Sequence, residues 1–83
     1  MTDAEIRALI LGLICDIAPE ADTAAARDED DIREAFDLDS MDVINLVTAI
    51  HERTKINIPA SDYNKIFVLK NAIAYVRNAL ARV

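Results

Sequence analysis

Apolar residues recur through the first part of the chain with the spacing of one buried helix face. They stand at i, i+3, i+4, i+7, i+8 and i+11: Ile6, Leu9, Ile10, Leu13, Ile14 and Ile17. Thr2 and Glu5 have the spacing of a capping box, and Pro19 cannot continue a helix. The pattern predicts a first helix over about residues 3–17.

A second helix is predicted over about residues 40–54, with two sets of side chains that face different ways. One set forms a single stripe at 100° per residue: Val43, Leu46, Val47 and Ile50. The other points roughly 100 to 160° away from Val43 and has no obvious core to join: Met41, Ile44 and Thr48. We expect the first face to be buried and the second to be exposed.

Shorter elements and a closing helix follow. "KINIP" at residues 55–59 alternates through Ile56 and Ile58, which predicts a short extended anchor. "SDYNKIF" at residues 61–67 predicts a brief third helix capped by Ser61 or Asp62. A last helix over about residues 69–81 is predicted from one apolar stripe: Leu69, Ala72, Ile73, Val76 and Leu80.

The connection between the first two helices, residues 18–39, is longer than most helix-to-helix links. It is rich in Asp and Ala, and its large apolar residues, Ile32, Phe36 and Leu38, are expected to anchor it to the core. "DEDDIREAF" at residues 28–36 has room for one extra helical turn, because acidic side chains suit a helix N-terminus.

Composition supports an all-α fold in one domain spanning residues 1–83. The chain has 83 residues, 53% of them hydrophobic, so most apolar residues are needed for a single core and little room remains for an enclosed active site. There is one glycine and no tryptophan, which favours helices over a turn-rich sheet.

Charge is unevenly spread over a formal total of −6. Residues 1–42 carry thirteen Asp and Glu against three Arg, which argues against nucleic-acid binding and favours basic proteins as partners. Cys15 is the only cysteine and falls opposite the apolar stripe, so we expect a surface thiol in a reducing cytoplasm. The acidic start lacks the basic flank of a signal peptide, and no apolar run reaches transmembrane length.

Two kinds of catalytic or metal chemistry are excluded by spacing. Ser40 and His51 would lie about 16 Å apart along one helix, too far for a nucleophile and its base. Asp37 and Asp39 match the first and third positions of a calcium-binding loop, but positions five, six and twelve do not fit. Ser40 instead stands at the first turn of a helix, where an attached phosphate is favoured. Alternatively, Asp39 or Ser40 simply caps the helix.

The surroundings of Ser40 resemble the acyl carrier protein family, whose members are phosphopantetheine-binding domains. The resemblance covers about residues 3–82 and rests on "LDSMD", the "VINLVTAIHE" run, "INIP", "DYNKI" and the closing amphipathic helix. It implies a four-helix bundle with a long first loop and a short third helix. It also implies that the protein is a carrier and not an enzyme, that it works as a monomer in the cytoplasm, and that it delivers acyl thioesters to synthase, ligase or acyl-transferring enzymes.

The resemblance assigns a role to each residue around the serine. Ser40 would receive 4′-phosphopantetheine from a phosphopantetheinyl transferase that uses coenzyme A and Mg²⁺, and Asp39 would help to orient the metal-bound donor. The exposed patch that partner enzymes contact would comprise Met41, Ile44 and Thr48, with Asp42 as a partner-facing acid.

The sequence also departs from the family's usual pattern. Asn45, His51 and Arg53 stand where conventional fatty-acid carriers have glutamates, and Asp37 stands where a glycine is usual. These departures suggest a dedicated carrier with its own partner set. A carrier of aminoacyl or polyketide groups is an alternative, and an unmodified helical adaptor that binds proteins through Met41 and Ile44 is an alternative of a different class.

Overall fold

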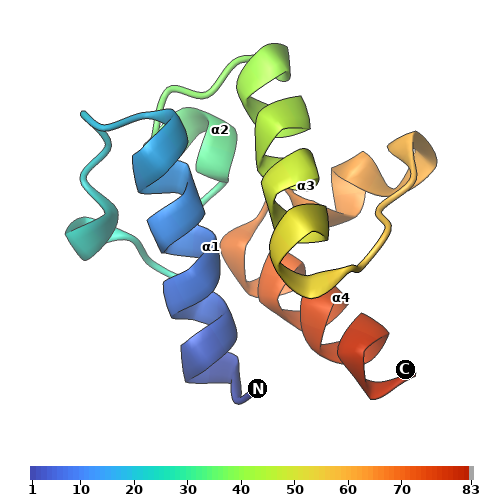
Figure 1. Cartoon of the computed structure of the whole chain (residues 1–83). Coiled ribbons are helices and arrows are strands. Elements are labelled where there is room, and N and C mark those ends of the chain that lie inside the picture. Colours follow the sequence, from blue (N-terminus) through green and yellow to red (C-terminus); the bar gives the residue numbers. More distant parts are fainter. Residues whose placement is uncertain (83) are drawn as a thin grey trace.

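The computed structural model describes residues 1–82, and every regular element in that range is helical (Figure 1). In chain order the elements are α1 (Asp3–Ile17), η1 (Thr23–Ala25), α2 (Ile32–Ala35), α3 (Ser40–Thr54), η2 (Ala60–Ile66) and α4 (Leu69–Ala81). The η elements are 3₁₀-helices. The predicted all-α bundle, with its long first loop and short third helix, is confirmed.

The three long helices enclose one hydrophobic core. α1 packs against both α3 and α4, and η2 packs against α4. α3 begins at the end of the bundle opposite the N-terminus, while α4 finishes at the same end of the bundle as the N-terminus (Figure 1). The side chains almost completely removed from solvent come from every long helix, from α2 and from η2: Ile6, Ile10, Ile14, Ile32, Leu46, Ile50, Ile66, Leu69 and Val76.

α1 has the predicted bounds and the predicted capping box. The Thr2 backbone N–H donates to Glu5 Oε1 at 2.8 Å, and the Glu5 N–H donates to Thr2 Oγ1 at 3.2 Å. The hydrogen bond from the Thr2 backbone N–H lowers the pKa of the Glu5 carboxyl below its usual value. Leu11, which the single stripe left out, is buried as well. The buried face extends to Leu11 because α1 packs on both α3 and α4, whereas Leu9 and Ile17 of the predicted stripe are only partly buried.

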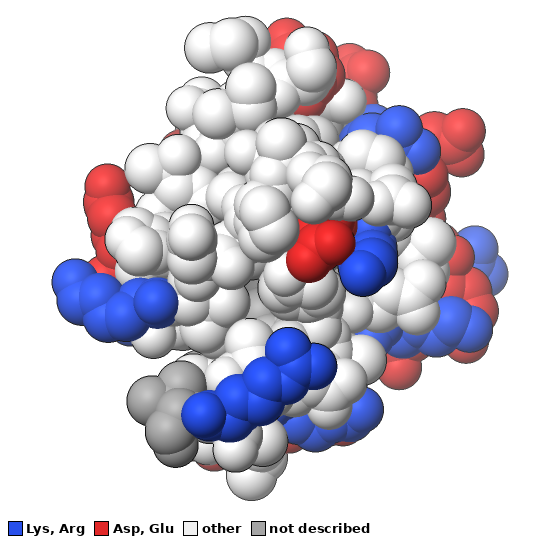
Figure 2. Space-filling view, turned by 90° about the vertical axis from the view of Figure 1, so that its right-hand side faces the viewer, with Lys and Arg blue, Asp and Glu red and all other residues white. Residues whose placement is uncertain are grey.

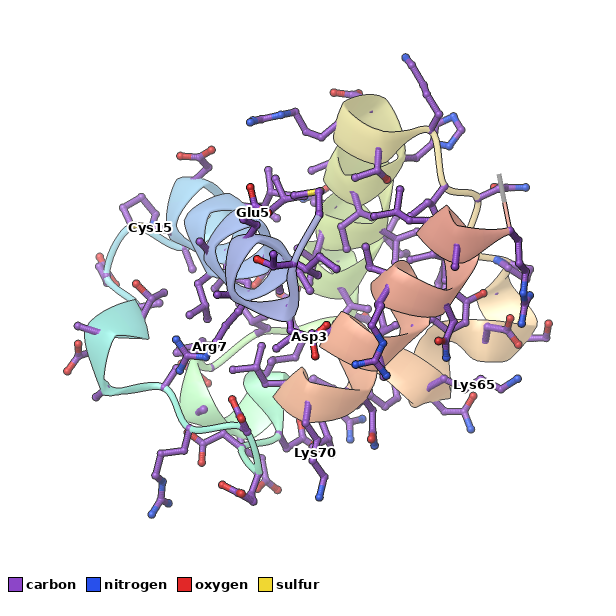
Figure 3. All side chains as sticks on the ribbon, turned by 90° about the horizontal axis from the view of Figure 1, so that it is seen from below. Asp3, Glu5, Arg7, Cys15, Lys65 and Lys70 are labelled. Atoms are coloured by element: carbon purple, nitrogen blue, oxygen red, sulfur yellow. The ribbon has the colours of Figure 1, made fainter. Side chains whose placement is uncertain are left out.

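The long first loop is fastened to the segment that precedes α4. The Ile32 N–H donates to the Phe67 carbonyl at 2.8 Å, and the Leu69 N–H donates to the Asp30 carbonyl at 3.0 Å. Arg7 of α1 secures the middle of the loop, with Nη2 donating to the Ala26 carbonyl at 2.7 Å (Figure 3). The predicted extra turn is α2, and its predicted anchors are buried: Ile32, Phe36 and Leu38. The turn η1 was not predicted.

The third helix differs from the prediction at its start. Pro59 takes the N-cap position with no side-chain hydrogen bond, so neither Ser61 nor Asp62 is the cap. The Asp62 carboxylate is engaged elsewhere, because the Tyr75 hydroxyl donates to it at 2.7 Å and Lys65 Nζ lies 3.2 Å away. Contacts to α4 therefore outweigh the local capping preference. The anchors Ile56 and Ile58 that precede this helix are buried as predicted.

Two observations concern the surface of the bundle. Cys15 projects from α1 as an exposed free thiol, as predicted (Figure 3). Within the described residues, the helices are too short or too polar to cross a membrane.

Candidate functional site

Ser40 is the first residue of α3, and Asp39 is the residue that caps this helix. The Asp42 N–H donates to Asp39 Oδ1 at 2.9 Å, and the Asp39 N–H donates to Asp42 Oδ2 at 3.2 Å. The two aspartates thus form a reciprocal capping box around the serine. The sequence alone is compatible with either Asp39 or Ser40 as the cap, and the structure shows that Asp39 caps the helix.

The Ser40 side chain is left available by this arrangement. Ser40 is exposed, and its hydroxyl has no hydrogen-bond partner among residues 1–82. The first turn of a helix presents backbone N–H groups without intrahelical partners and the positive end of the helix dipole. The exposed Ser40 oxygen, at the positive end of the helix dipole, is therefore a position to which a phosphodiester can be attached.

A hollow of ≈ 240 Å³ opens beside Ser40. Its walls come from α2, from the start of α3 and from η2 and the residue after it: Arg33, Leu38, Asp39, Ser40, Val43, Ile44, Tyr63 and Phe67. The sequence analysis missed Arg33, Tyr63 and Phe67 as site residues. No periodic pattern could have revealed them, because the backbone bonds between the first loop and the segment before α4 bring them together.

Arg33 is the most constrained polar side chain in the hollow. Its Nε and Nη2 donate to the Asp31 carboxylate at 3.2 and 2.9 Å, and its Cζ lies 3.7 Å from the centroid of the Phe67 ring. The hydrogen bonds from Arg33 lower the pKa of the Asp31 carboxyl, and the same contact raises the pKa of the Arg33 guanidinium. Both groups are therefore charged at neutral pH.

Asp37 adopts a backbone conformation that favours glycine. Its φ is 54°, in the left-handed region, and the next N–H, that of Leu38, donates to the Arg33 carbonyl at 2.9 Å. This bond ends α2 in the manner of a Schellman motif. The conformation costs an L-residue roughly 1–2 kcal/mol, although aspartate tolerates it better than most. The left-handed backbone conformation thus explains why glycine would be favoured at this position, which Asp37 occupies in this chain.

The predicted patch on α3 is exposed near Ser40. Met41 is 61% exposed and Ile44 is 43% exposed, while the opposite face of α3 is buried through Val43, Leu46, Val47 and Ile50. Thr48 is exposed, and its hydroxyl donates to the Ile44 carbonyl at 3.0 Å. Asp42 is half-buried, because its carboxylate completes the capping box.

Charged side chains are distributed unevenly around this end of the molecule. On the face that carries η2, Lys and Arg side chains gather in the lower half, whereas the middle of the upper half, toward the start of α3, is uncharged (Figure 2). Within the described part of the chain, no group of three or more His, Cys, Asp or Glu residues is placed to hold a metal ion.

Comparison with known proteins agrees with this geometry. Residues 8–76 match the family described as the phosphopantetheine attachment site. The acyl carrier protein of Campylobacter jejuni is 35% identical over 57 residues, which cover 69% of this chain and 74% of that protein. The acyl carrier protein of Campylobacter hominis is 34% identical over 62 residues, covering 75% and 73%. That of Helicobacter hepaticus is 40% identical over 43 residues, covering 52% and 57%. The chain belongs to the phosphopantetheine-binding acyl carrier protein family.

Proposed function

We propose that this chain is one acyl carrier domain, residues 1–83, and that its 4′-phosphopantetheine arm is attached through a phosphodiester to Ser40. Membership of the acyl carrier family supports the cofactor and the carrier role. The observation that carries the choice of residue is the exposed, unpartnered Ser40 hydroxyl at the start of α3, with its helix capped independently by Asp39. Ser61, the other serine of the chain, lies in the 3₁₀-helix η2 instead.

The protein's own residues hold and present the cargo; they do not transform it. The terminal thiol of the arm supplies the thioester link to the acyl group. Asp39 and Asp42 fix the start of α3, so the Ser40 oxygen points from a rigid element. Asp39 also stands beside the serine, where it orients the metal-bound donor of the transferase. The protein is not an enzyme, because catalysis is left to the partners that receive the acyl group.

The partners are a phosphopantetheinyl transferase and soluble acyl-handling enzymes of the synthase, ligase or transferase type. Met41 and Ile44 supply an apolar contact next to Ser40, and Thr48 extends it one turn further along α3. Asp42 adds a negative charge at the edge of this contact. Because Asn45, His51 and Arg53 follow in place of a run of acids, the partners differ from those of conventional fatty-acid carriers.

The carrier acts as a monomer in the cytoplasm. The lone exposed thiol of Cys15 suits a reducing compartment. Among the described residues, the large exposed apolar side chains are Met1, Met41 and Ile44, and the last two belong to the partner patch. The names of the relatives support an acyl cargo over an aminoacyl or polyketide one, and over an unmodified adaptor.

Attachment of the arm is tested by loading and peptide mapping. The purified protein is incubated with coenzyme A, Mg²⁺ and a broad-specificity phosphopantetheinyl transferase, and its intact mass is measured. We expect a gain of one phosphopantetheine on a peptide that contains Ser40. Ser40→Ala should abolish the gain and keep the helical circular dichroism spectrum, whereas Ser61→Ala, the matched control, should load normally. Loading of the Ser40→Ala variant, or no loading of the native protein, would refute the proposal.

A further inference from the structure

Within the described residues, Arg33 is the only Lys or Arg side chain that lines the hollow beside Ser40. Its guanidinium is held in two ways, by the fork to the Asp31 carboxylate and by its stacking over the Phe67 ring. The fork uses Nε and Nη2, so the N–H groups of Nη1 remain for another acceptor. A planar guanidinium fixed in this way loses little further freedom when an additional anion binds.

The surroundings of Ser40 are otherwise acidic. Asp37, Asp39 and Asp42 lie within three residues of the serine, and their carboxylates are at or near the start of α3. A phosphodiester on Ser40 adds a further negative charge to this cluster, and like charges at short range repel one another. Among the hollow-lining residues, Arg33 alone carries the charge that would attract the phosphodiester.

The fold itself brings Arg33 to this position. The Ile32 N–H donates to the Phe67 carbonyl at 2.8 Å, and Asp31 forms an isolated antiparallel bridge with Val68. These backbone contacts fasten α2 to the segment before α4 and set Arg33 on the Phe67 ring. Arg33 and Ser40 therefore lie on the rim of the same hollow, although neither is adjacent to the other in sequence.

We propose that Arg33 binds the phosphodiester of the arm and so holds the beginning of the arm in the hollow between α2, α3 and η2. This inference rests on the proposed attachment at Ser40. Nη1 of Arg33 supplies N–H groups for the phosphate oxygens, and Val43 and Phe67 supply apolar wall to the hollow in which the arm begins. Arg33 is thus a positioning residue, which gives the arm a preferred resting place from which a partner enzyme draws it.

The contact can be observed by phosphorus NMR of the holo protein. The phosphodiester resonance of the native wild-type holo protein should differ in chemical shift from that of the same protein in concentrated urea. Arg33→Gln should move the native resonance toward the urea position. Arg27→Gln is the matched control, because Arg27 lies in the same loop, its side chain is 80% exposed, and it pairs with Asp30 outside the hollow. It should leave the resonance unchanged.

A stability cycle separates this role from a purely structural one. Apo and holo forms of the wild type and of Arg33→Gln are unfolded with urea. A role confined to supporting α2 would reduce the stability of both forms equally. Binding of the phosphodiester should instead reduce the folded-to-unfolded ratio of the holo form roughly two- to tenfold more than that of the apo form. Arg33→Lys keeps the positive charge but not the paired hydrogen bonds of the guanidinium. It should therefore show part of the extra loss of stability in the holo form, and it serves as a second variant if Arg33→Gln folds poorly.

The possible results distinguish this inference from the proposed function. Suppose that Ser40 loads, that the phosphorus shift is the same in wild type, Arg33→Gln and Arg33→Lys, and that the apo and holo forms are destabilised equally. This result would overturn the role of Arg33 and leave the carrier function intact. Failure of Ser40 to load at all would overturn both. A shift that depends on Arg33 but not on Arg27 would support both.

Discussion

An acyl chain attached through the arm at Ser40 should stabilise the folded protein increasingly with its length. The hollow beside Ser40 reaches Val43, which is buried. We expect the chain to enter a seam lined by buried apolar side chains of α3, η2 and α4: Val43, Val47, Ile50, Ile66, Leu69 and Ile73. Because the arm itself begins in this hollow, the acyl chain must part the seam to enter it.

The expected stabilisation follows from the area that each methylene removes from water. A buried methylene contributes about 0.8 kcal/mol, so three or four contribute about 2 to 3 kcal/mol before the cost of ordering the chain and opening the seam. If that cost takes half or more of the gain, the net stabilisation is on the order of 1 kcal/mol. For a domain of this size, 1 kcal/mol corresponds to about 4–8 °C in melting temperature.

The assay is thermal unfolding of the holo protein and of a series of acyl forms that differ only in chain length. The melting temperature should rise with chain length and then level off when the seam is full. Val43→Phe is the control, because the larger ring occupies the mouth of the seam. It should remove the dependence on chain length even if the holo variant is itself less stable. A melting temperature independent of chain length in the wild type would refute this reasoning, since the acyl group would then remain in solvent.

Three further predictions concern the rest of the site. Met41→Asp and Ile44→Asp should weaken transferase binding, measured by titration, because both side chains are largely exposed beside Ser40. Each should change the free energy of unfolding by no more than about 0.5 kcal/mol. Unfolding of either variant would instead place the patch in the core. Asp37→Gly should raise the free energy of unfolding, measured with urea, by about 0.5 kcal/mol. The free energy gained by relieving the left-handed strain exceeds the free-energy cost of the extra entropy that glycine gives the unfolded chain. A loss of stability would contradict this prediction. The hydrogen bond from Tyr75 lowers the pKa of the Asp62 carboxyl, so its stabilisation is complete above the ordinary value of 3.8 and is lost as the pH falls through the lowered one. The stability difference between wild type and Tyr75→Phe should therefore shrink in that acid range, and a difference constant with pH would exclude this coupling.

Local sequence pattern was sufficient to predict the three long helices, α1, α3 and α4. Apolar spacing identified α1, α3 and α4 because each helix buries one face. The buried positions of such a face recur every three or four residues, so a few turns of sequence are enough to recognise it. The Thr2–Glu5 capping box was predictable for the same reason, since both partners lie within one turn. The exposure of Met41 and Ile44 followed from their angle to the buried stripe on the same helix.

Tertiary structure decided the features that depend on contacts between distant segments. Asp62 was an apparent helix cap, but Tyr75 of α4 engages its carboxylate and Pro59 begins η2 earlier. The sequence shows Arg33 only as a basic residue in an acidic loop. The backbone bonds from that loop to the Phe67 segment are what bring Arg33 to the hollow that Ser40 also lines. Periodicity records which face of an element is buried. It does not record which element covers that face, because the free energy of that choice is shared among side chains far apart in the sequence.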